Sequence, residues 1–273
     1  MIKKIITLVA IFALLLATNS VGATPPSTSL GASQAQRTLV LPEAADHSPV
    51  ISLGTAHDPQ SGQLVEGYAI IHYKGEQAKP DHAGKPAASV CYGFLAKDAK
   101  WKAVEPWVVN PANSRGLASD FIFSNLSGDI AKWENAVQGI NILGNGSTAT
   151  GTLIADTASP DGQNEVYFAD VANDGAIAVT IVWGIFGGPP AGRQLVEWDQ
   201  IYDDVDFDWS ASGEADKMDF ENIATHELGH SVGLADLYNS ACSAETMYGY
   251  AGLGETIKRD LNTGDIAGVN KLY

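Results

Sequence analysis

One stretch of the sequence, residues 226–236 (HELGHSVGLAD), combines side chains that can bind a metal ion with one that can move a proton. On a helix, His226 and His230 lie on one face, one turn apart, so that their imidazoles can bind a single ion. Glu227 lies about 100° around such a helix from His226, where its carboxylate can reach a water on the ion without binding the ion itself. The pattern predicts a catalytic zinc site with Glu227 as the general base.

The helix is predicted to end at Gly233, because glycine adopts the left-handed conformation that a sharp turn requires. The turn would bring Asp236 toward the metal, and two neutral imidazoles with one carboxylate leave a fourth position for water. His226 and His230 are the only histidines after residue 82, so a third imidazole could come only from the N-terminal region. A carboxylate is therefore expected as the third ligand, and Glu245 competes with Asp236 for this role.

The composition excludes several classes of partner. Of the 273 residues, 45% are hydrophobic and 18% are charged, which is typical of a globular chain with a sizeable core. The 16 basic and 32 acidic residues give a net charge of −16, so nucleic acid and anionic membrane surfaces would be repelled. Two cysteines exclude a disulfide-dense scaffold and a four-cysteine metal site.

The N-terminus has the pattern of a secretory signal peptide, residues 1–23. MIKK supplies the basic region, residues 5–17 are apolar, and VGA provides small residues for cleavage after Ala23. A membrane-spanning helix needs about 20 residues, which is more than this apolar run offers, and an uncleaved anchor is the alternative. We therefore expect a secreted, extracellular protein without a stable membrane anchor after signal cleavage.

Residues 24–85 are predicted to be a propeptide or linker region, and residues 86–273 a catalytic domain. The region begins with a Pro- and Ser-rich stretch, contains a strand-like run at 64–73, and ends in KGEQAKPDHAGK, which predicts a boundary open to proteolysis. Four histidines without ligand spacing precede residue 85, and we expect them in loops or on the surface: His47, His57, His72 and His82.

The order of apolar segments after residue 86 predicts an α+β, or mixed α/β, fold. Helical spacing predicts a long helix over 119–137, Asp219 is the predicted N-cap of the metal-binding helix, and residues 264–272 predict a final helix. Short runs bounded by Gly, Asn, Asp and Pro predict strands at 104–109, 140–143, 150–155, 165–169, 176–183 and 195–202.

The stretch HELGHSVGLAD resembles the metzincin zinc endopeptidases, whose pattern is HExxHxxGxxH or HExxHxxGxxD followed by a methionine turn. Residues 245–248 (ETMY) resemble that turn, which in the family places a methionine, here Met247, beneath the zinc. The matrixins look like the closest branch, because their turn also reads Met-Tyr and their C-terminal helix resembles LNTGDIAGVNKLY. The resemblance covers about Trp101 to Tyr273 and is specific from His226 onward.

Three departures separate the sequence from the matrixin pattern. Asp236 replaces the third histidine, as in the aspartate-type metzincins. Gly249 stands where some metzincins have a tyrosine, so that Tyr250, one residue further, is the candidate transition-state stabiliser. The sequence also lacks the histidines that would form a matrixin structural zinc site.

The resemblance implies a twisted five-stranded mixed sheet with a long first helix, an active-site helix and a C-terminal helix. It also implies an antiparallel edge strand that binds substrate as an added strand, and residues 176–183 are the candidate for it. Zinc in such a site would polarise the scissile carbonyl and lower the pKa of its water, while Glu227 takes a proton and passes it to the leaving amine.

The two cysteines favour a disulfide between Cys91 and Cys242, because an exported chain folds in an oxidising compartment. The alternatives are a matrixin-like switch, in which the Cys91 thiolate occupies the fourth zinc position in the precursor, and free thiols. An oxygen-rich run favours a solvated acidic turn, and a structural calcium site is the alternative, with calcium as a second cofactor: Asp199, Asp203, Asp204, Asp206 and Asp208.

The sequence therefore predicts a secreted zinc-dependent endopeptidase, made as a zymogen, that acts as a monomer on protein or peptide substrates. The alternative is a zinc-bearing extracellular binding or adhesion module without turnover. A third hypothesis is a metal-free structural domain. Glu227 argues against the binding module, because a structural zinc site gives no reason for a carboxylate between its ligands.

Overall fold

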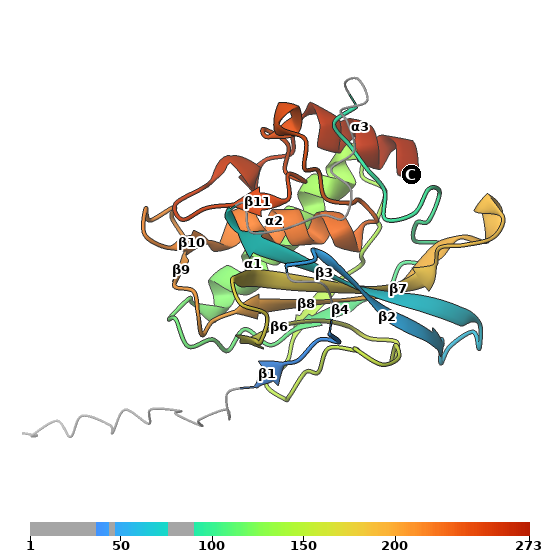
Figure 1. Ribbon diagram of the computed structural model, residues 1–273, viewed down its shortest axis with the longest axis horizontal. Coiled ribbons are helices and arrows are strands. Elements are labelled where there is room, and N and C mark those ends of the chain that lie inside the picture. The colour runs from blue at the N-terminus through green and yellow to red at the C-terminus, as the bar shows by residue number, and fades with distance from the viewer. Residues whose placement is uncertain (1–36, 44–46, 76–89) are drawn as a thin grey trace, which may run out of the picture. The chain divides into compact units, whose positions relative to one another are not determined.

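The longest apolar runs of the chain form the middle of its sheet. β7 (Ala176–Ile185) reads AIAVTIVWGI and is buried along nearly its whole length, as expected of a strand covered on both faces. β8 (Gln194–Asp203) and β6 (Asn164–Val171) are buried in the same way. In the computed structural model, which describes residues 37–43, 47–75 and 90–273, these strands belong to one mixed sheet (Figure 1).

Five neighbouring strands of the sheet lie within residues 86–273, and the sequence predicts four of them. Their order is β5 (Gly146–Thr148), β4 (Trp107–Val109), β6, β8 and β7, and each neighbouring pair is parallel except β7 with β8. The mixed α/β class is therefore confirmed. The expectation of five strands is wrong, because the sheet has nine strands within the described residues, and it also contains β1 (Thr38–Leu39), β2 (Val50–His57), β3 (Leu64–Lys74) and β11 (Tyr250–Ala251).

The added strand β3 changes the environment of β7. It lies between β7 on one side and β2 and β11 on the other. Its antiparallel register with β7 extends from Glu66↔Gly184 to Tyr73↔Ala176. β7 therefore has a hydrogen-bonded neighbour along both sides, which corrects the expectation that residues 176–183 form an edge strand.

The described part of the predicted propeptide region packs together with the predicted catalytic domain. The described residues from 37 onward belong to one compact unit, in which the early strand β1 pairs with β6. The predicted boundary between residues 85 and 86 lies outside the described residues and stays a prediction. The predicted signal peptide, residues 1–23, lies outside the described residues. Within the described ranges, no helix combines the length and apolar character needed to cross a membrane.

Three α-helices of the described chain lie on the same side of the sheet (Figure 1): α1 (Ser119–Ala136), α2 (Phe220–Ser231) and α3 (Thr263–Leu272). All three match the predicted helices closely, and the Asp219 carboxylate caps α2 by accepting from Asn222 N at 3.0 Å. A small ladder of β9 (Trp209–Ser210) and β10 (Met218–Asp219) leads into α2. Short 3-10 turns lie at Pro190–Gly192, Ser240–Cys242 and Ile257–Arg259.

Two strand predictions are wrong. Residues 140–143 and 150–155 form loops on either side of β5. Ile142 and Leu153 are buried in the core without strand pairing, whereas Ile140 and Ile154 are exposed. Burial of an apolar side chain does not require a strand, and short apolar runs alone do not distinguish the two.

Two apolar cores cover the two faces of the sheet. The first core lies between the helices and the face of the sheet that they cover. The second core lies on the opposite face and includes side chains of the N-terminal strands. Trp133 of α1 is fully buried, and its indole Nε1 donates to Thr225 O on α2 at 2.9 Å. This contact fixes the position of α2, the helix that carries the metal-binding motif.

Candidate metal centre

α2 holds its functional side chains inside the protein. His226 and Glu227 are 0% exposed, and His230 is 1% exposed. The helix backbone lies directly against the methionine turn, since a Cβ atom at Gly229 would overlap the Met247 sulfur. The glycine within HELGH is therefore required by its close packing against Met247.

Both histidines have their rings oriented by backbone carbonyls. His226 Nδ1 lies 2.7 Å from Thr246 O, and His230 Nδ1 lies 2.9 Å from Leu234 O. A carbonyl oxygen only accepts, so we assign the hydrogen of each neutral ring to Nδ1, and the Nε2 lone pair of the neutral ring can then bind a metal ion. Both Nε2 atoms are buried and have no hydrogen-bond partner.

Asp236 reaches the same point after the turn at Gly233, whose φ of +105° is the left-handed conformation expected there. Its Oδ1 lies 3.1 Å from His226 Nε2 and 3.5 Å from His230 Nε2, and Oδ1 also has no hydrogen-bond partner. Ligands of a tetrahedral zinc ion lie about 3.3–3.5 Å apart, because zinc–ligand bonds are about 2.0–2.2 Å long. The three atoms therefore fit a zinc ion.

Glu245, the competing third ligand, lies elsewhere. Its Oε2 accepts from Gly264 N at 2.8 Å and from Asp265 N at 3.2 Å, at the start of α3. The carboxylate that lies close enough to His226 and His230 to share a metal ion with them is that of Asp236. Glu245 lies at the start of α3 because the unsatisfied N–H groups at a helix N-terminus attract a carboxylate.

The methionine turn is anchored by the C-terminal helix. Asp265 is 1% exposed and accepts from Thr246 N at 2.7 Å and from Met247 N at 3.1 Å. Thr246 in turn provides the carbonyl that orients His226. α3 therefore positions the metal centre through the turn.

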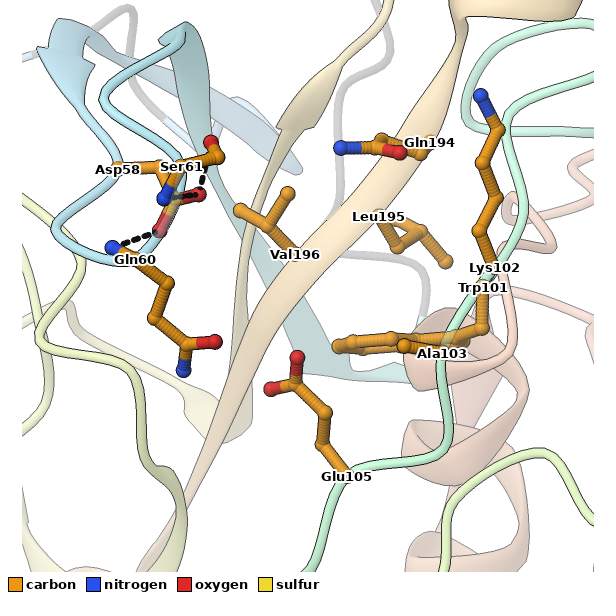
Figure 2. Close-up of a pocket in the computed structure, with 10 residues that line it drawn as sticks. All are labelled: Asp58, Gln60, Ser61, Trp101, Lys102, Ala103, Glu105, Gln194, Leu195 and Val196. Atoms are coloured by element: carbon orange, nitrogen blue, oxygen red, sulfur yellow. Dashed lines mark hydrogen bonds between the residues drawn. The ribbon is translucent and has the colours of Figure 1, made fainter.

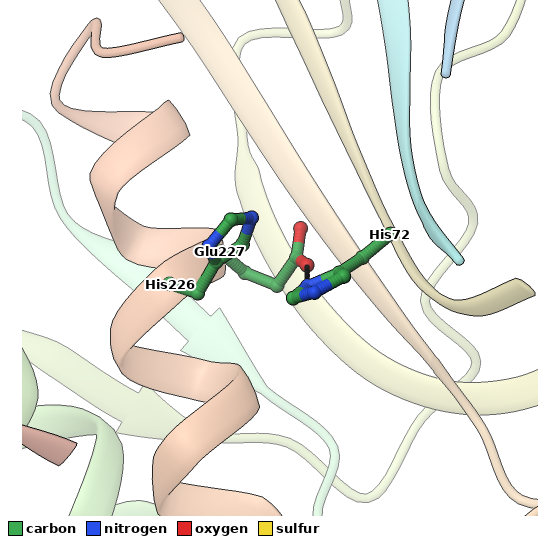
Figure 3. Close-up of side chains that lie close together, drawn as sticks. All are labelled: His72, His226 and Glu227. Carbon is green, nitrogen blue, oxygen red and sulfur yellow. Dashed lines mark hydrogen bonds and ion pairs between the residues drawn. The ribbon is translucent and has the colours of Figure 1, made fainter. Parts of the chain in front are cut away.

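Glu227 is held by two residues that the sequence analysis did not select. His72 Nδ1 on β3 lies 3.1 Å from Glu227 Oε1, and Thr180 on β7 donates to Oε2 at 2.5 Å. The His72 and His226 rings lie 4.0 Å apart between centroids (Figure 3). The expectation of a surface position for His72 is wrong, since it is 1% exposed. Strand alternation predicts that His72 shares a face with Ile70, but only the pairing of β3 with β7 brings that face to Glu227.

A third missed residue is Tyr238, whose hydroxyl donates to Asp236 Oδ2 at 2.9 Å. Its ring lies 5.2 Å from that of Tyr250, the candidate transition-state stabiliser. The structure thus brings Tyr250 next to the residue that supports Asp236. No sequence spacing marks Tyr238, because its role depends on where the loop after Gly233 runs.

Burial and neighbouring charges set the protonation of the metal-free centre. Burial raises the pKa of Glu227 and lowers the pKa of His72 to about 3 and of His226 to about 4. For His230, burial acts downward but the Asp236 carboxylate outweighs it and raises the pKa to about 9. The same pairing holds the pKa of Asp236 well below its ordinary value, against the effect of burial. A metal ion must therefore displace a proton from His230 at neutral pH.

Cys91 and Cys242, the pair for which the sequence favours a disulfide, are joined by one, with their Cα atoms 5.3 Å apart. Cys242 belongs to the 3-10 turn between α2 and the methionine turn. The bond therefore ties the start of the predicted catalytic domain to the segment between α2 and the methionine turn.

The acidic run at 199–208 does not gather around one point. Asp203 accepts from the backbone N–H groups of Val205 and Asp206, both at 2.8 Å, and Asp208 pairs with Arg115 at 2.8 Å. Asp199 is buried in another group of carboxylates. Calcium binding by this run is not supported, because its side chains serve the turn itself.

Two cavities lie near the sheet. One, of about 310 Å³, lies between the β2–β3 turn, residues 101–105 and the start of β8, and the metal centre does not line it (Figure 2). The other, of about 260 Å³, is lined by residues that include Val50, Ile70, Leu95, Asp236 and Tyr238. The second cavity therefore reaches the metal centre at Asp236.

The matrixin family model matches residues 190–273. The matched segment contains α2, the turn to Asp236, Met247 and α3. A search of curated proteins finds no match. Over residues 190–273 the chain is therefore matrixin-like, and zinc-dependent peptidase chemistry is the general activity that such a segment indicates.

Proposed function

We propose that this chain is a secreted zinc endopeptidase that hydrolyses peptide bonds in proteins, with His226, His230 and Asp236 as metal ligands and Glu227 as general base. The observation that carries the proposal is the convergence of three buried atoms without hydrogen-bond partners, the two histidine Nε2 atoms and Asp236 Oδ1. A buried polar atom without a partner is costly, and a metal ion removes that cost. The same residues lie in the matrixin-like segment.

The chemistry of the chain centres on Glu227. A zinc ion bound by the three ligands would polarise a substrate carbonyl and lower the pKa of a water molecule. Glu227 follows His226 directly in α2, so that its carboxylate can take the proton of the attacking water and pass it to the leaving amine. Burial raises the pKa of Glu227, which makes it a stronger base near neutral pH. Thr180 supports this role by orienting the carboxylate.

Met247 and Tyr250 are proposed in the roles that the matrixin resemblance implies. Met247 is 1% exposed and supplies the apolar floor of the centre. Tyr250 would stabilise the transition state through its hydroxyl. A Tyr250→Phe variant that lowers kcat while KM and zinc content stay unchanged would support that role, and an unchanged kcat would exclude it.

We also infer that the described arrangement is the latent precursor, with residues 24–85 as the propeptide. β3 comes from this region and places His72 against Glu227. Both carboxylate oxygens of Glu227 are engaged, and the residue is 0% exposed. A polypeptide substrate must reach this carboxylate, so β3 has to leave first.

Departure of β3 would also create a binding site. β7 would lose its antiparallel partner along eight residue pairs, from Glu66↔Gly184 to Tyr73↔Ala176. The free N–H and C=O groups of a strand edge bind an extended peptide as an added strand. Substrate would then take the place of β3, and His72 would no longer contact Glu227.

The test measures casein cleavage by the full chain before and after limited trypsin treatment, with trypsin inhibited before casein is added. Wild type is expected to cleave only after the N-terminal region, β3 included, has been removed, and a chelator is expected to stop the cleavage. Glu227→Ala, treated identically, is expected to bind one zinc ion per chain without cleaving. N-terminal sequencing and metal analysis accompany each sample.

Each contrary result has a distinct meaning. Equal cleavage by untreated wild type that retains β3 would refute latency but not the peptidase. Stoichiometric zinc without cleavage in every sample would favour the binding or adhesion module. If wild type binds no zinc after zinc reconstitution, the metal-free structural domain would be the remaining hypothesis.

A further inference from the structure

The segment that follows Asp236 runs beside the methionine turn. Leu237 N donates to Met247 O at 2.8 Å, and Gly249 N donates to Leu237 O at 2.9 Å. These two backbone hydrogen bonds fix Leu237 against the turn. Its neighbours in the chain, Asp236 and Tyr238, are therefore placed by the turn as well.

Gly249 leaves the space that the Tyr238 ring occupies. A Cβ atom at Gly249 would lie 2.5 Å from Cε1 and 2.7 Å from Cζ of Tyr238, closer than a methyl group can approach a ring. The ring also packs edge-on against Tyr250, with the two centroids 5.2 Å apart and the ring planes at 67°. The glycine that stands where some metzincins have a tyrosine is therefore required by the ring of another tyrosine.

The two carboxylate oxygens of Asp236 have different surroundings. Oδ1 lies 3.1 Å from His226 Nε2 and 3.5 Å from His230 Nε2, and it has no hydrogen-bond partner. Oδ2 accepts from the Tyr238 hydroxyl at 2.9 Å. Carboxylates bind metal ions through one or both oxygens. In Asp236 the hydroxyl engages Oδ2 and leaves Oδ1 for the ion.

We propose that Tyr238 is a positioning residue that holds Asp236 as a metal ligand through one oxygen. This inference rests on the proposed function, because it concerns the ligands of that metal centre. A donor that hydrogen-bonds a ligand orients the ligand and tunes the metal ion. Three single-atom ligands leave a fourth position open, as a catalytic zinc site requires. A carboxylate bound through both oxygens would compete for that position.

Cobalt(II), which replaces zinc in such sites, reports the number of ligands, because four-coordinate cobalt absorbs visible light more strongly than five-coordinate cobalt. The test uses the full chain loaded with cobalt and needs no peptidase activity. Tyr238→Phe should lose visible absorption, because Oδ2 is then free to bind the ion. Gly249→Ala should show the same loss, since its methyl group displaces the Tyr238 ring. Tyr92→Phe, which removes a hydroxyl from a ring packed against α3, should retain the wild-type spectrum.

Zinc affinity, measured by competition with a chelator, separates positioning from a general loosening of the site. Loss of a residue that merely stabilises Asp236 would lower zinc affinity about 10–100-fold. Binding of the freed Oδ2 should keep the loss in Tyr238→Phe below about 10-fold. Tyr238→Phe decides the question alone if Gly249→Ala does not fold.

Two contrary results have different meanings. An unchanged cobalt spectrum in Tyr238→Phe that binds the ion would overturn the proposal and leave the metal centre as proposed. Failure of wild type to bind either cobalt or zinc would refute the metal centre, and the role of Tyr238 with it.

Discussion

Asp265→Asn is expected to weaken both the fold and the metal centre, because one buried carboxylate accepts three backbone hydrogen bonds. Oδ2 accepts from Thr246 N and from Asn262 N at 2.9 Å, and Oδ1 accepts from Met247 N. An amide of the same shape has a single acceptor oxygen. Whichever way it turns, its NH2 group faces at least one of these N–H groups.

The magnitude follows from this count. A hydrogen bond to a charged group contributes about 1.5–3 kcal/mol, and a buried N–H left without a partner costs about 1–3 kcal/mol. The nearby Glu245, whose pKa burial and Asp265 both raise, would be relieved of repulsion, which offsets part of the loss. We expect the free energy of unfolding to fall by about 2–4 kcal/mol. Zinc affinity should fall about 10–100-fold, because Thr246 O orients His226.

Urea unfolding followed by tryptophan fluorescence measures the first quantity, and competition with a zinc chelator of known affinity measures the second. Asp174→Asn serves as the control, since it removes the same charge from an exposed turn. A loss below about 1 kcal/mol with unchanged zinc affinity would refute the conclusion that α3 holds the methionine turn.

Three further outcomes are expected. Gly229→Ala should destabilise the protein by about 1–3 kcal/mol in calorimetry, because the new methyl group would overlap Met247, whereas an open helical site would gain stability from alanine. Replacing Cys91 and Cys242 by serine should cost up to about 5 kcal/mol, since the bond closes a loop with a separation of 151 residues, and finding both cysteines alkylated without prior reduction would exclude the bond. The free energy of unfolding should fall as pH rises from 4.5 to about 7, because burial raises the pKa of Glu165 from 4.5 to about 7 and the unfolded chain loses that proton first. Glu165→Gln should flatten this slope, and an identical slope in the variant would contradict the assignment.

Much of the metal centre could be predicted because its determinants are local in sequence. His226 and His230 meet through helical periodicity, Asp219 caps the helix, and Gly233 supplies the turn that brings Asp236 back. The mixed fold class followed in the same way from apolar periodicity. Each of these inferences uses interactions between residues a few positions apart.

The contacts of Glu227 could not be predicted, because they depend on strand pairing across the chain. His72 and Glu227 are 155 positions apart, and Thr180 and Glu227 are 47 apart. A slip of one residue in the register of β3 would turn His72 to the opposite face of the sheet. The predicted number of strands was wrong for the same reason, because an apolar run at 64–73 does not reveal which strand it will pair with.

The position of β3 has a consequence for how the protein is assembled. β3 pairs with β11 through Tyr73↔Tyr250, so the sheet is incomplete until nearly the whole chain has been synthesised. At about 5–20 residues per second, the ribosome needs roughly 10–35 seconds to make the intervening residues. Pairing over such distances is also slow. β3 is nevertheless made before α2, so the strand that covers Glu227 exists before the helix that carries it, and the centre can form directly in its covered state.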